Sequence, residues 1–198
     1  ADETEVLKNT VPSRTSTWRY YVNGMVPLET EKGNFYDGFQ LKDTIESCLS
    51  VEAVDVIRDT TTNVTDEFTI TQSGQNVAAK AKNTKSADFY SHNYQLRIKV
   101  KLKSDASDAT LASHGHFNSA KTALTFHNTG YVIYTDGNGS STRKTPTTTT
   151  TLQLPTKSAG APGLKITKSV SKKEWQVGDL VAYTIKVSQT NPKATATH

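Results

Sequence analysis

Residues 94–102 read Tyr-Gln-Leu-Arg-Ile-Lys-Val-Lys-Leu, and this stretch decides the fold class. Apolar side chains occupy the even positions, while Gln95 and three cationic side chains occupy the odd positions between them. Successive side chains of a strand point to opposite faces, so this alternation puts every apolar group on one face. The pattern predicts a half-buried β-strand with a wet, basic outer face.

The same period of two extends outward along the chain. It recurs in residues 17–26, 38–43 and 123–134, and more weakly near 51–58, 66–72 and 76–82. Polar turn signals separate these segments, and no stretch keeps a helical stripe. We therefore predict an all-β, immunoglobulin-like antiparallel β-sandwich. Residues 104–122 are polar and rich in Ala and Ser, which predicts an inserted loop or a short helix capping one end of the sandwich.

Composition shifts divide the chain into two modules. The Thr tract 147–151 is β-branched throughout and predicts the final strand of a first domain, residues 1–155. Residues 156–163 are small and polar, which predicts a linker. After them, 164–170 echoes 6–11, and 175–187 echoes the strand 17–26. Residues 164–198 are thus expected to be the N-terminal strands of a second, truncated sandwich repeat.

Charge and cysteine content exclude several classes of protein. The net charge is +4, from 23 basic and 19 acidic residues without a contiguous basic run, so no nucleic-acid partner is expected. No run of about 18 apolar residues exists, so no membrane insertion of this segment is expected. A single cysteine, Cys48, excludes an intramolecular disulfide and reads as a small buried apolar residue.

Three polar residues fall where strand parity points toward the core. Asp43 shares its face with Phe39 in the strand 38–43, and Asn128 shares its face with the apolar residues of 123–134. Lys8 shares a face with Val6 in a short first strand. Burying such groups costs several kcal/mol unless they are paired or consumed.

Together these three residue types can form a covalent bond. Burial lowers the pKa of a lysine and raises the pKa of an aspartic acid, so Lys8 becomes a neutral nucleophile and Asp43 a proton shuttle. The Lys8 amine would attack the Asn128 amide and leave an isopeptide bond. Two alternatives remain open: Asn128 lies in an ordinary β-bulge, or Asn118 or Asn138, in loop-like segments, is the acceptor.

The order of these residues resembles the isopeptide-forming domain of Gram-positive fimbrial and surface adhesins, a collagen-adhesin A-like family. The resemblance covers about residues 5–155. It rests on Lys-x-x-Val at 8–11, Val26-Pro27 after an aromatic strand, Phe-x-Leu-x-Asp-x-Ile at 39–45 with Leu49 following, and Asn-x-Gly-x-Val at 128–132. The chain departs from the family in the long 104–122 segment and in a glycine, Gly130, where a small apolar residue is more usual.

The resemblance implies a cross-link between Lys8 and Asn128, with Asp43 as its catalyst. It implies a stalk or shaft module of a cell-surface adhesin or pilus-like protein, extracellular and anchored to a Gram-positive cell wall. Cross-linking happens once per molecule, so the module is not an enzyme. Its expected partners are neighbouring repeats of the same polypeptide and a host surface ligand, and no cofactor is expected.

Other functions have weaker support in the sequence. The main alternative is an adhesin domain that binds a host protein or glycan through its loops, with 104–122 and the aromatic pairs 35–36 and 89–90 as its surface. A hydrolase has only the neighbouring pair Ser113-His114. No metal site is expected, because no carboxylate or cysteine stands at ligand spacing from His114 and His116. The 136–139 turn lacks the ligands of a calcium loop.

Overall fold

The structure, a computed structural model, describes residues 5–28, 35–155, 164–170 and 183–189. The chain divides into two compact units, Ala1–Leu154 and Pro155–His198, and each is described by itself. The predicted linker 156–163, residues 29–34 and residues 175–182 of the expected second repeat lie outside the described residues.

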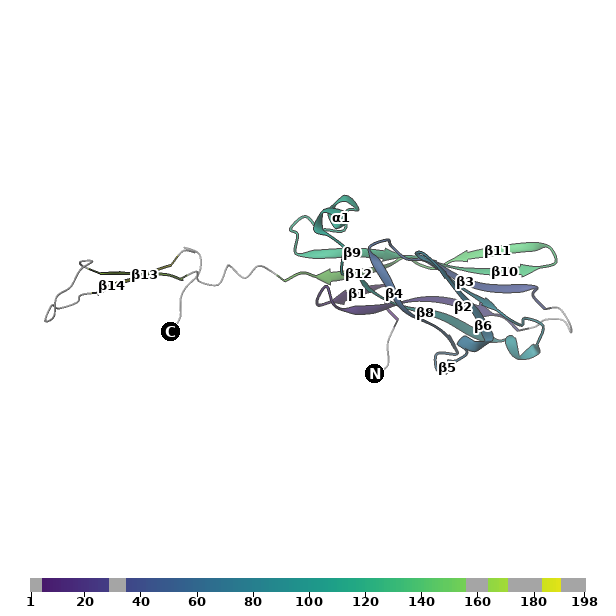
Figure 1. Ribbon diagram of the computed structural model, residues 1–198. Coiled ribbons are helices and arrows are strands. Elements are labelled where there is room, and N and C mark those ends of the chain that lie inside the picture. Colours follow the sequence, from purple (N-terminus) through teal and green to yellow (C-terminus); the bar gives the residue numbers. More distant parts are fainter. Residues whose placement is uncertain (1–4, 29–34, 156–163, 171–182, 190–198) are drawn as a thin grey trace. The chain divides into compact units, whose positions relative to one another are not determined.

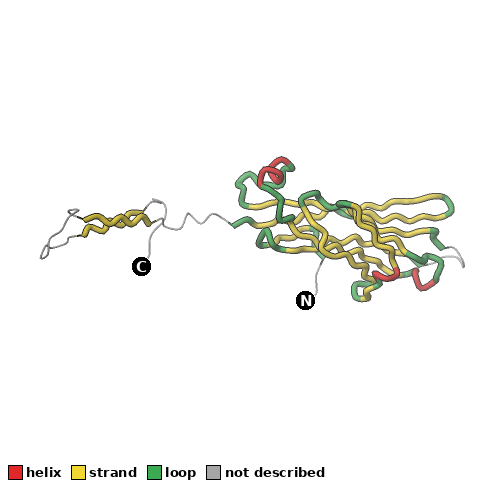
Figure 2. Tube along the Cα trace, viewed as in Figure 1, coloured by secondary structure: helices red, strands yellow, loops and turns green. Residues whose placement is uncertain are grey.

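Strands dominate the first unit, with three short helical turns between them (Figure 2). The strands are β1 (Lys8–Val11), β2 (Thr17–Val26), β3 (Gly38–Thr44), β4 (Leu49–Arg58), β5 (Thr62–Asn63), β6 (Phe68–Ser73), β7 (Asn76–Ala81), β8 (His92–Leu102), β9 (Ala123–Asn128), β10 (Gly130–Asp136), β11 (Gly139–Lys144) and β12 (Thr148–Gln153). The helical turns are η1 (Thr65–Glu67), η2 (Ala87–Phe89) and α1 (Asp108–Ser113).

The strands form two layers, as Figure 1 shows. One layer is the sheet β2-β8-β4-β5. The other consists of the sheet β11-β10-β3-β7-β6 and the sheet β1-β12-β9, which follow each other where β9 leads into β10. Every pairing is antiparallel except that of β1 with β12, which is parallel and places the first and last strands of the unit side by side. The predicted all-β, immunoglobulin-like sandwich is confirmed.

Strand β8 forms the centre of its sheet, between β2 and β4. Its even residues Tyr94, Leu96, Ile98 and Val100 are fully buried, as the alternation in the sequence predicts. They face the opposite layer across the core, where Tyr94 packs against Phe39 of β3 with ring centroids 5.8 Å apart. Burying each such side chain contributes about 1.5–3 kcal/mol.

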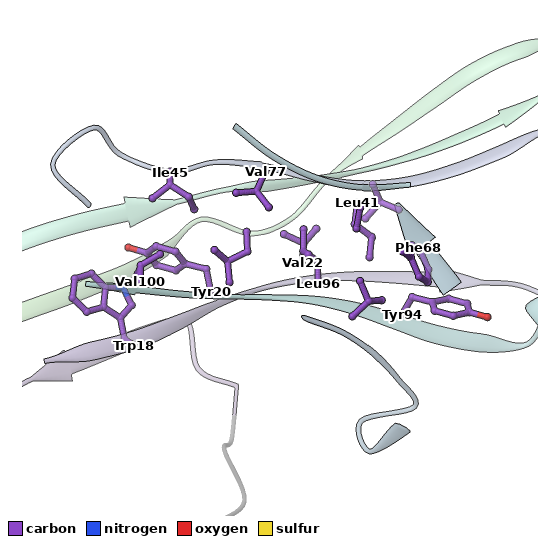
Figure 3. Packing of buried hydrophobic residues seen from close by; sticks show 14 of the residues in the cluster. Trp18, Tyr20, Val22, Leu41, Ile45, Phe68, Val77, Tyr94, Leu96 and Val100 are labelled. Atoms are coloured by element: carbon purple, nitrogen blue, oxygen red, sulfur yellow. The ribbon is translucent and has the colours of Figure 1, made fainter. Parts of the chain in front are cut away.

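The core runs the length of the sandwich. Figure 3 shows its packing, with side chains of β2 and β8 facing those of the other layer. The side chains labelled there are Trp18, Tyr20, Val22, Leu41, Ile45, Phe68, Val77, Tyr94, Leu96 and Val100. A continuous core of this kind fixes which face of each strand is inward.

The segment 123–134, predicted as one strand, is two strands. β9 ends at Asn128 and β10 begins at Gly130, because the chain changes partners there from β12 to β3 and β11. The parity nevertheless persists, and Asn128, Gly130 and Val132 are all buried. A Cβ at Gly130 would lie 2.2 Å from Cγ2 of Val22, so close packing between the layers requires glycine at this position.

The insert 104–122 contains a short helix, α1, one of the two predicted alternatives. Ser107 caps the helix, and its Oγ accepts a hydrogen bond from the Thr110 N–H at 3.1 Å. Leu111 is fully buried and anchors the insert to the core. The insert therefore has a fixed place at the end of the sandwich where β9 begins (Figure 1).

The second unit contains an antiparallel pair, β13 (Leu164–Val170) and β14 (Tyr183–Gln189). Strand β13 coincides with residues 164–170, the segment that echoes residues 6–11. The second sandwich repeat remains a prediction. Among the described residues, no helix has the length and apolar character needed to cross a membrane.

Candidate functional site

A buried carboxyl–amide pair lies at the point where β9 gives way to β10. Asp43 on β3 is 2% exposed and Asn128, the last residue of β9, is 6% exposed. Nδ2 of Asn128 donates a hydrogen bond of 2.7 Å to Oδ2 of Asp43. Asp43 pairs in register with Gly130, two residues beyond Asn128, so the two sheets of this layer bring the side chains together. The structure thus places two of the three predicted site residues in contact.

The pair does not satisfy its own hydrogen-bonding capacity. Oδ1 of Asp43, Oδ1 of Asn128 and Oγ1 of Thr148 are all buried, and none has a hydrogen-bond partner among the described residues. Thr148 on β12 lies directly across from Asn128 in the ladder. A buried polar atom without a partner costs about 1–3 kcal/mol. The site is therefore a polar cluster that is one or more partners short.

Burial raises the pKa of Asp43 from 3.8 to about 6, although the hydrogen bond from Asn128 and the adjacent Thr44 backbone N–H oppose the shift. Burial also raises the pKa of Tyr20 on β2, and the carboxyls of Glu46 and Asp43 add to that shift. Asp43 can thus hold a proton in mildly acidic solution, which is what a proton shuttle requires.

Lys8 is not brought to this pair. Its side chain is exposed, and it pairs with Thr149, which in turn pairs with the exposed His127 on β9. Side chains aligned across a sheet point to the same face, so Lys8 lies on the outer face, opposite to Asn128. The prediction that Lys8 and Val6 point inward is wrong for this arrangement, since Val6 is 53% exposed.

Which residues of β1 face the core is determined by Val11, at the C-terminal end of the strand. Val11 is 6% exposed and pairs with the fully buried Leu152, while Asn9 pairs with the buried Thr150. The odd residues of the strand therefore face the core. A shift of β1 by one residue would exchange the two faces and turn the Lys8 side chain inward.

A groove of about 910 Å³ reaches Thr148, the residue across from Asn128 in the ladder, although neither Asp43 nor Asn128 lines it. Leu7, just before the first strand, lines the groove with Asn9 and Val11 of that strand and with Tyr20 and Thr148. The groove is thus the approach from β1 to the buried cluster. The sequence did not predict Tyr20 and Thr148 as members of this site. Tyr20 was recognisable only as an inward residue of the strand 17–26, and Thr148 only as part of the Thr tract.

The surface expected for a ligand-binding adhesin is partly core. Phe89 and Tyr90 are 6% and 5% exposed, and Tyr36 stacks on Tyr90 with ring centroids 6.1 Å apart. The pair 89–90 is therefore part of the core, and the pair 35–36 is partly buried against it. The Ser113 Oγ donates to the Thr110 carbonyl, a bond within its own helix, so it forms no pair with His114.

Comparisons with solved structures show the same fold in bacterial surface proteins. BcpA, the major pilin subunit of Bacillus cereus, matches 81% of this chain at 15% identity with a TM-score of 0.57. The major pilin SpaD of Corynebacterium diphtheriae matches 86% of the chain at 16% identity with a TM-score of 0.52. The N-terminal domain of the Streptococcus gordonii adhesin Sgo0707 matches 73% at 13% identity with a TM-score of 0.54.

The match covers only a part of each of these proteins. It spans 39% of the BcpA chain, 36% of the SpaD chain and 30% of the Sgo0707 chain. No protein-family model and no curated protein matches the sequence. The likeness lies in the fold: the chain has the immunoglobulin-like β-sandwich of Gram-positive pilin and adhesin domains.

Proposed function

We propose that this chain is a structural stalk or shaft module of an extracellular, wall-anchored adhesin or pilus-like protein of a Gram-positive bacterium. An intramolecular isopeptide bond between Lys8 and Asn128, formed with Asp43 as catalyst, stabilises it. The fold shared with pilin and adhesin domains supports the role. Neighbouring repeats of the same polypeptide are its partners along the stalk.

The observation that carries the proposal is the unsatisfied buried pair. Asp43 and Asn128 are in hydrogen-bond contact at 2.7 Å, yet each retains a buried oxygen without a partner among the described residues. A folded core keeps such groups only when a further partner or a function offsets their cost. An amine entering from β1, which lies one strand away from β9 on the other side of β12, would supply that partner.

The reaction balances without any co-reactant. The neutral Lys8 Nζ attacks Cγ of Asn128, and protonated Asp43 polarises the amide oxygen after the amide has turned to present it. The new Cγ–Nζ bond forms as the Cγ–Nδ2 bond breaks, and Asp43 passes its proton to the departing nitrogen and takes one from Nζ of Lys8. The products are one secondary amide and one ammonia, and Asp43 ends in the protonation state in which it began.

Lys8 reaches the pair only after β1 changes its alignment by one residue. The strand is four residues long and lies at the sheet edge, so few hydrogen bonds oppose such a shift. The groove lined by Leu7, Asn9 and Tyr20 provides the space for the lysine side chain. The bond then fixes the shifted alignment.

Intact-mass measurement of the chain and its variants tests the bond. The wild-type mass should be lower than that of the sequence by about 17 Da, one ammonia. The variants K8A, D43A and N128A should each have their full mass. N118A and N138A, which change the two alternative acceptors, should keep the deficit. A full-length wild-type mass would contradict the bond, and a deficit that survives N128A would contradict the acceptor.

A second function, binding of a host protein or glycan, is favoured by the size of the groove. At about 910 Å³ it is large enough for a small ligand, and Tyr21, Arg19 and Arg143 line it. Screening the wild type against host matrix proteins and glycans would identify a ligand. The variant R143E should lose that ligand, and K82E, outside the groove, should keep it. A spacer without this function would bind nothing in the screen.

A further inference from the structure

A cluster of three side chains that can bind a metal ion lies where the insert meets the turn after β3, and none of the three lines the groove. Glu46 and Cys48 come from the turn between β3 and β4, and His116 follows α1 in the insert. One ligand atom from each of the three residues lies within 4.8 Å of the others. We propose that Glu46, Cys48 and His116 bind a zinc-type divalent cation, which fastens the insert 104–122 to the β3–β4 turn.

The cysteine and the histidine are already placed as two ligands of one ion. Sγ of Cys48 lies 3.2 Å from Nε2 of His116, and both residues are buried. Tetrahedral zinc, with its usual bond lengths to sulfur and nitrogen, separates these two atoms by about 3.6 Å. A small outward movement of either side chain therefore makes room for the ion.

The tautomer of His116 leaves the correct nitrogen free. Nδ1 lies 3.0 Å from the carbonyl oxygen of Thr125, and a carbonyl oxygen can only accept. Nδ1 therefore carries the proton, and the lone pair of Nε2 points toward Cys48. Metal-binding histidines are commonly oriented in this way, by donating from the nitrogen that does not bind the metal.

Glu46 contributes the negative charge. Its Oε1 accepts a hydrogen bond of 2.7 Å from the His127 N–H, which fixes the carboxylate. Its Oε2 is buried, lies 3.3 Å from Nδ1 of His116, and has no hydrogen-bond partner among the described residues. Oε2 faces the protonated Nδ1 side of the ring, so the carboxylate must rotate to reach a cation at Nε2, and the ligand atoms of the three residues lie close enough together for such a movement.

The cation would replace a single proton. Burial, with the Glu46 carboxylate adding to it, raises the pKa of the Cys48 thiol to about 11, so the metal-free residue is a neutral thiol. On binding, the Sγ–H bond breaks, an Sγ–metal bond forms and one proton leaves to solvent. Sulfur and imidazole ligands favour zinc over calcium or magnesium, and water takes the fourth position.

Titration of the reduced, metal-stripped 198-residue chain with Co²⁺ tests the proposal. One equivalent should produce the thiolate-to-cobalt charge-transfer absorption, and Zn²⁺ should displace it. Zn²⁺ should also slow alkylation of Cys48, a readout that needs no variant. A folded wild-type chain without the absorption, and with unchanged alkylation, would overturn the proposal.

Variants assign the ligands. C48A should abolish the absorption and the one-to-one binding of Zn²⁺. E46Q keeps an oxygen for the His127 N–H but loses the charge, and it should bind Zn²⁺ at least about tenfold more weakly, because a unit negative charge next to the ion is lost. H114A is the matched control, because it removes a histidine whose ring centroid lies 6.0 Å from that of His116 but which is not one of the proposed ligands. This variant should bind Zn²⁺ as the wild type does. Binding of Zn²⁺ that is unchanged in both C48A and E46Q would place the ion elsewhere.

Discussion

At the scale of single residues, Asp43 carries the clearest electrostatic signature. Its pKa is about 6 in the fold against 3.8 for the free side chain, so the folded state favours the protonated form. This stabilisation is complete below about pH 4 and is lost as the pH rises through 6. At about 1.4 kcal/mol per pH unit, the loss is about 3 kcal/mol.

Denaturation of the K8A chain, which cannot form the bond, checks this expectation between pH 4 and 8. The free energy of unfolding of K8A should decline over this range, and that of the double variant K8A/D43N should not, because Asn at position 43 does not titrate. The same pH profile in both chains would mean that Asp43 titrates normally in the fold.

Gly130 gives a second prediction at this scale. A methyl group there would meet Val22 Cγ2 at 2.2 Å, so G130A should destabilise the fold by overpacking, by about 1–3 kcal/mol. Gly137 has no heavy atom within 4 Å of the same added Cβ, and G137A should change stability by less than about 0.5 kcal/mol. Urea unfolding of both variants measures the difference. Equal effects would contradict the close approach of the two layers.

At the scale of elements, long strands could be predicted from the sequence and the short first strand could not. Residues 94–102 show nine residues of unbroken alternation, so the inward face of β8 is unambiguous, and the same holds for Asp43 among Phe39 and Leu41. In β1 only Val11 is deeply buried. One apolar residue does not show which face of a strand is inward, and the apolar residues Val6 and Leu7 lie outside the strand.

Contacts between segments that are distant along the chain also could not be predicted from the sequence. Glu46 and Cys48 lie about seventy positions from His116, and nothing in their spacing along the chain indicates that a turn and an insert meet. The prediction that no metal site exists rests on the spacing of residues near His114 and His116, and such spacing does not reveal contacts between distant segments. The two-strand break at Thr129 is similar, because a change of partner strand leaves no mark on an unbroken parity.

The alignment of β1 itself can be tested by exchanging two residues. In the observed arrangement Leu7 lies just before β1 and is 59% exposed, its carbonyl accepts a hydrogen bond from the Thr149 N–H, and Lys8 faces outward. The double variant L7K/K8L moves the lysine to an odd position, the parity that faces the core within β1, without any shift of the strand. Its cross-linking, followed by mass against time after refolding, should be at least as fast as in the wild type. Failure of the exchanged chain to lose ammonia, while the wild type does so, would contradict the register.

At the scale of the whole molecule, the bond would join the first strand to the end of β9. It closes a loop of about 120 residues, which by the entropy of cross-linking contributes about 4–5 kcal/mol. K8A removes the bond and leaves the buried pair untouched, so its free energy of unfolding should fall by that amount. K42A, also an exposed lysine on a strand, should stay within about 0.5 kcal/mol of the wild type. Equal stability of the two variants would mean that no such loop is closed.

The most direct test of the central claim is to identify the bonded residues by peptide mapping. After protease digestion of the wild-type chain, fragmentation spectra should reveal one branched peptide that joins the segment containing Lys8 to the segment containing Asn128, with about 17 Da missing from their summed mass. The same digest of N128A should yield the two segments separately. Recovery of both segments unjoined and at full mass from the wild-type protein would contradict the account.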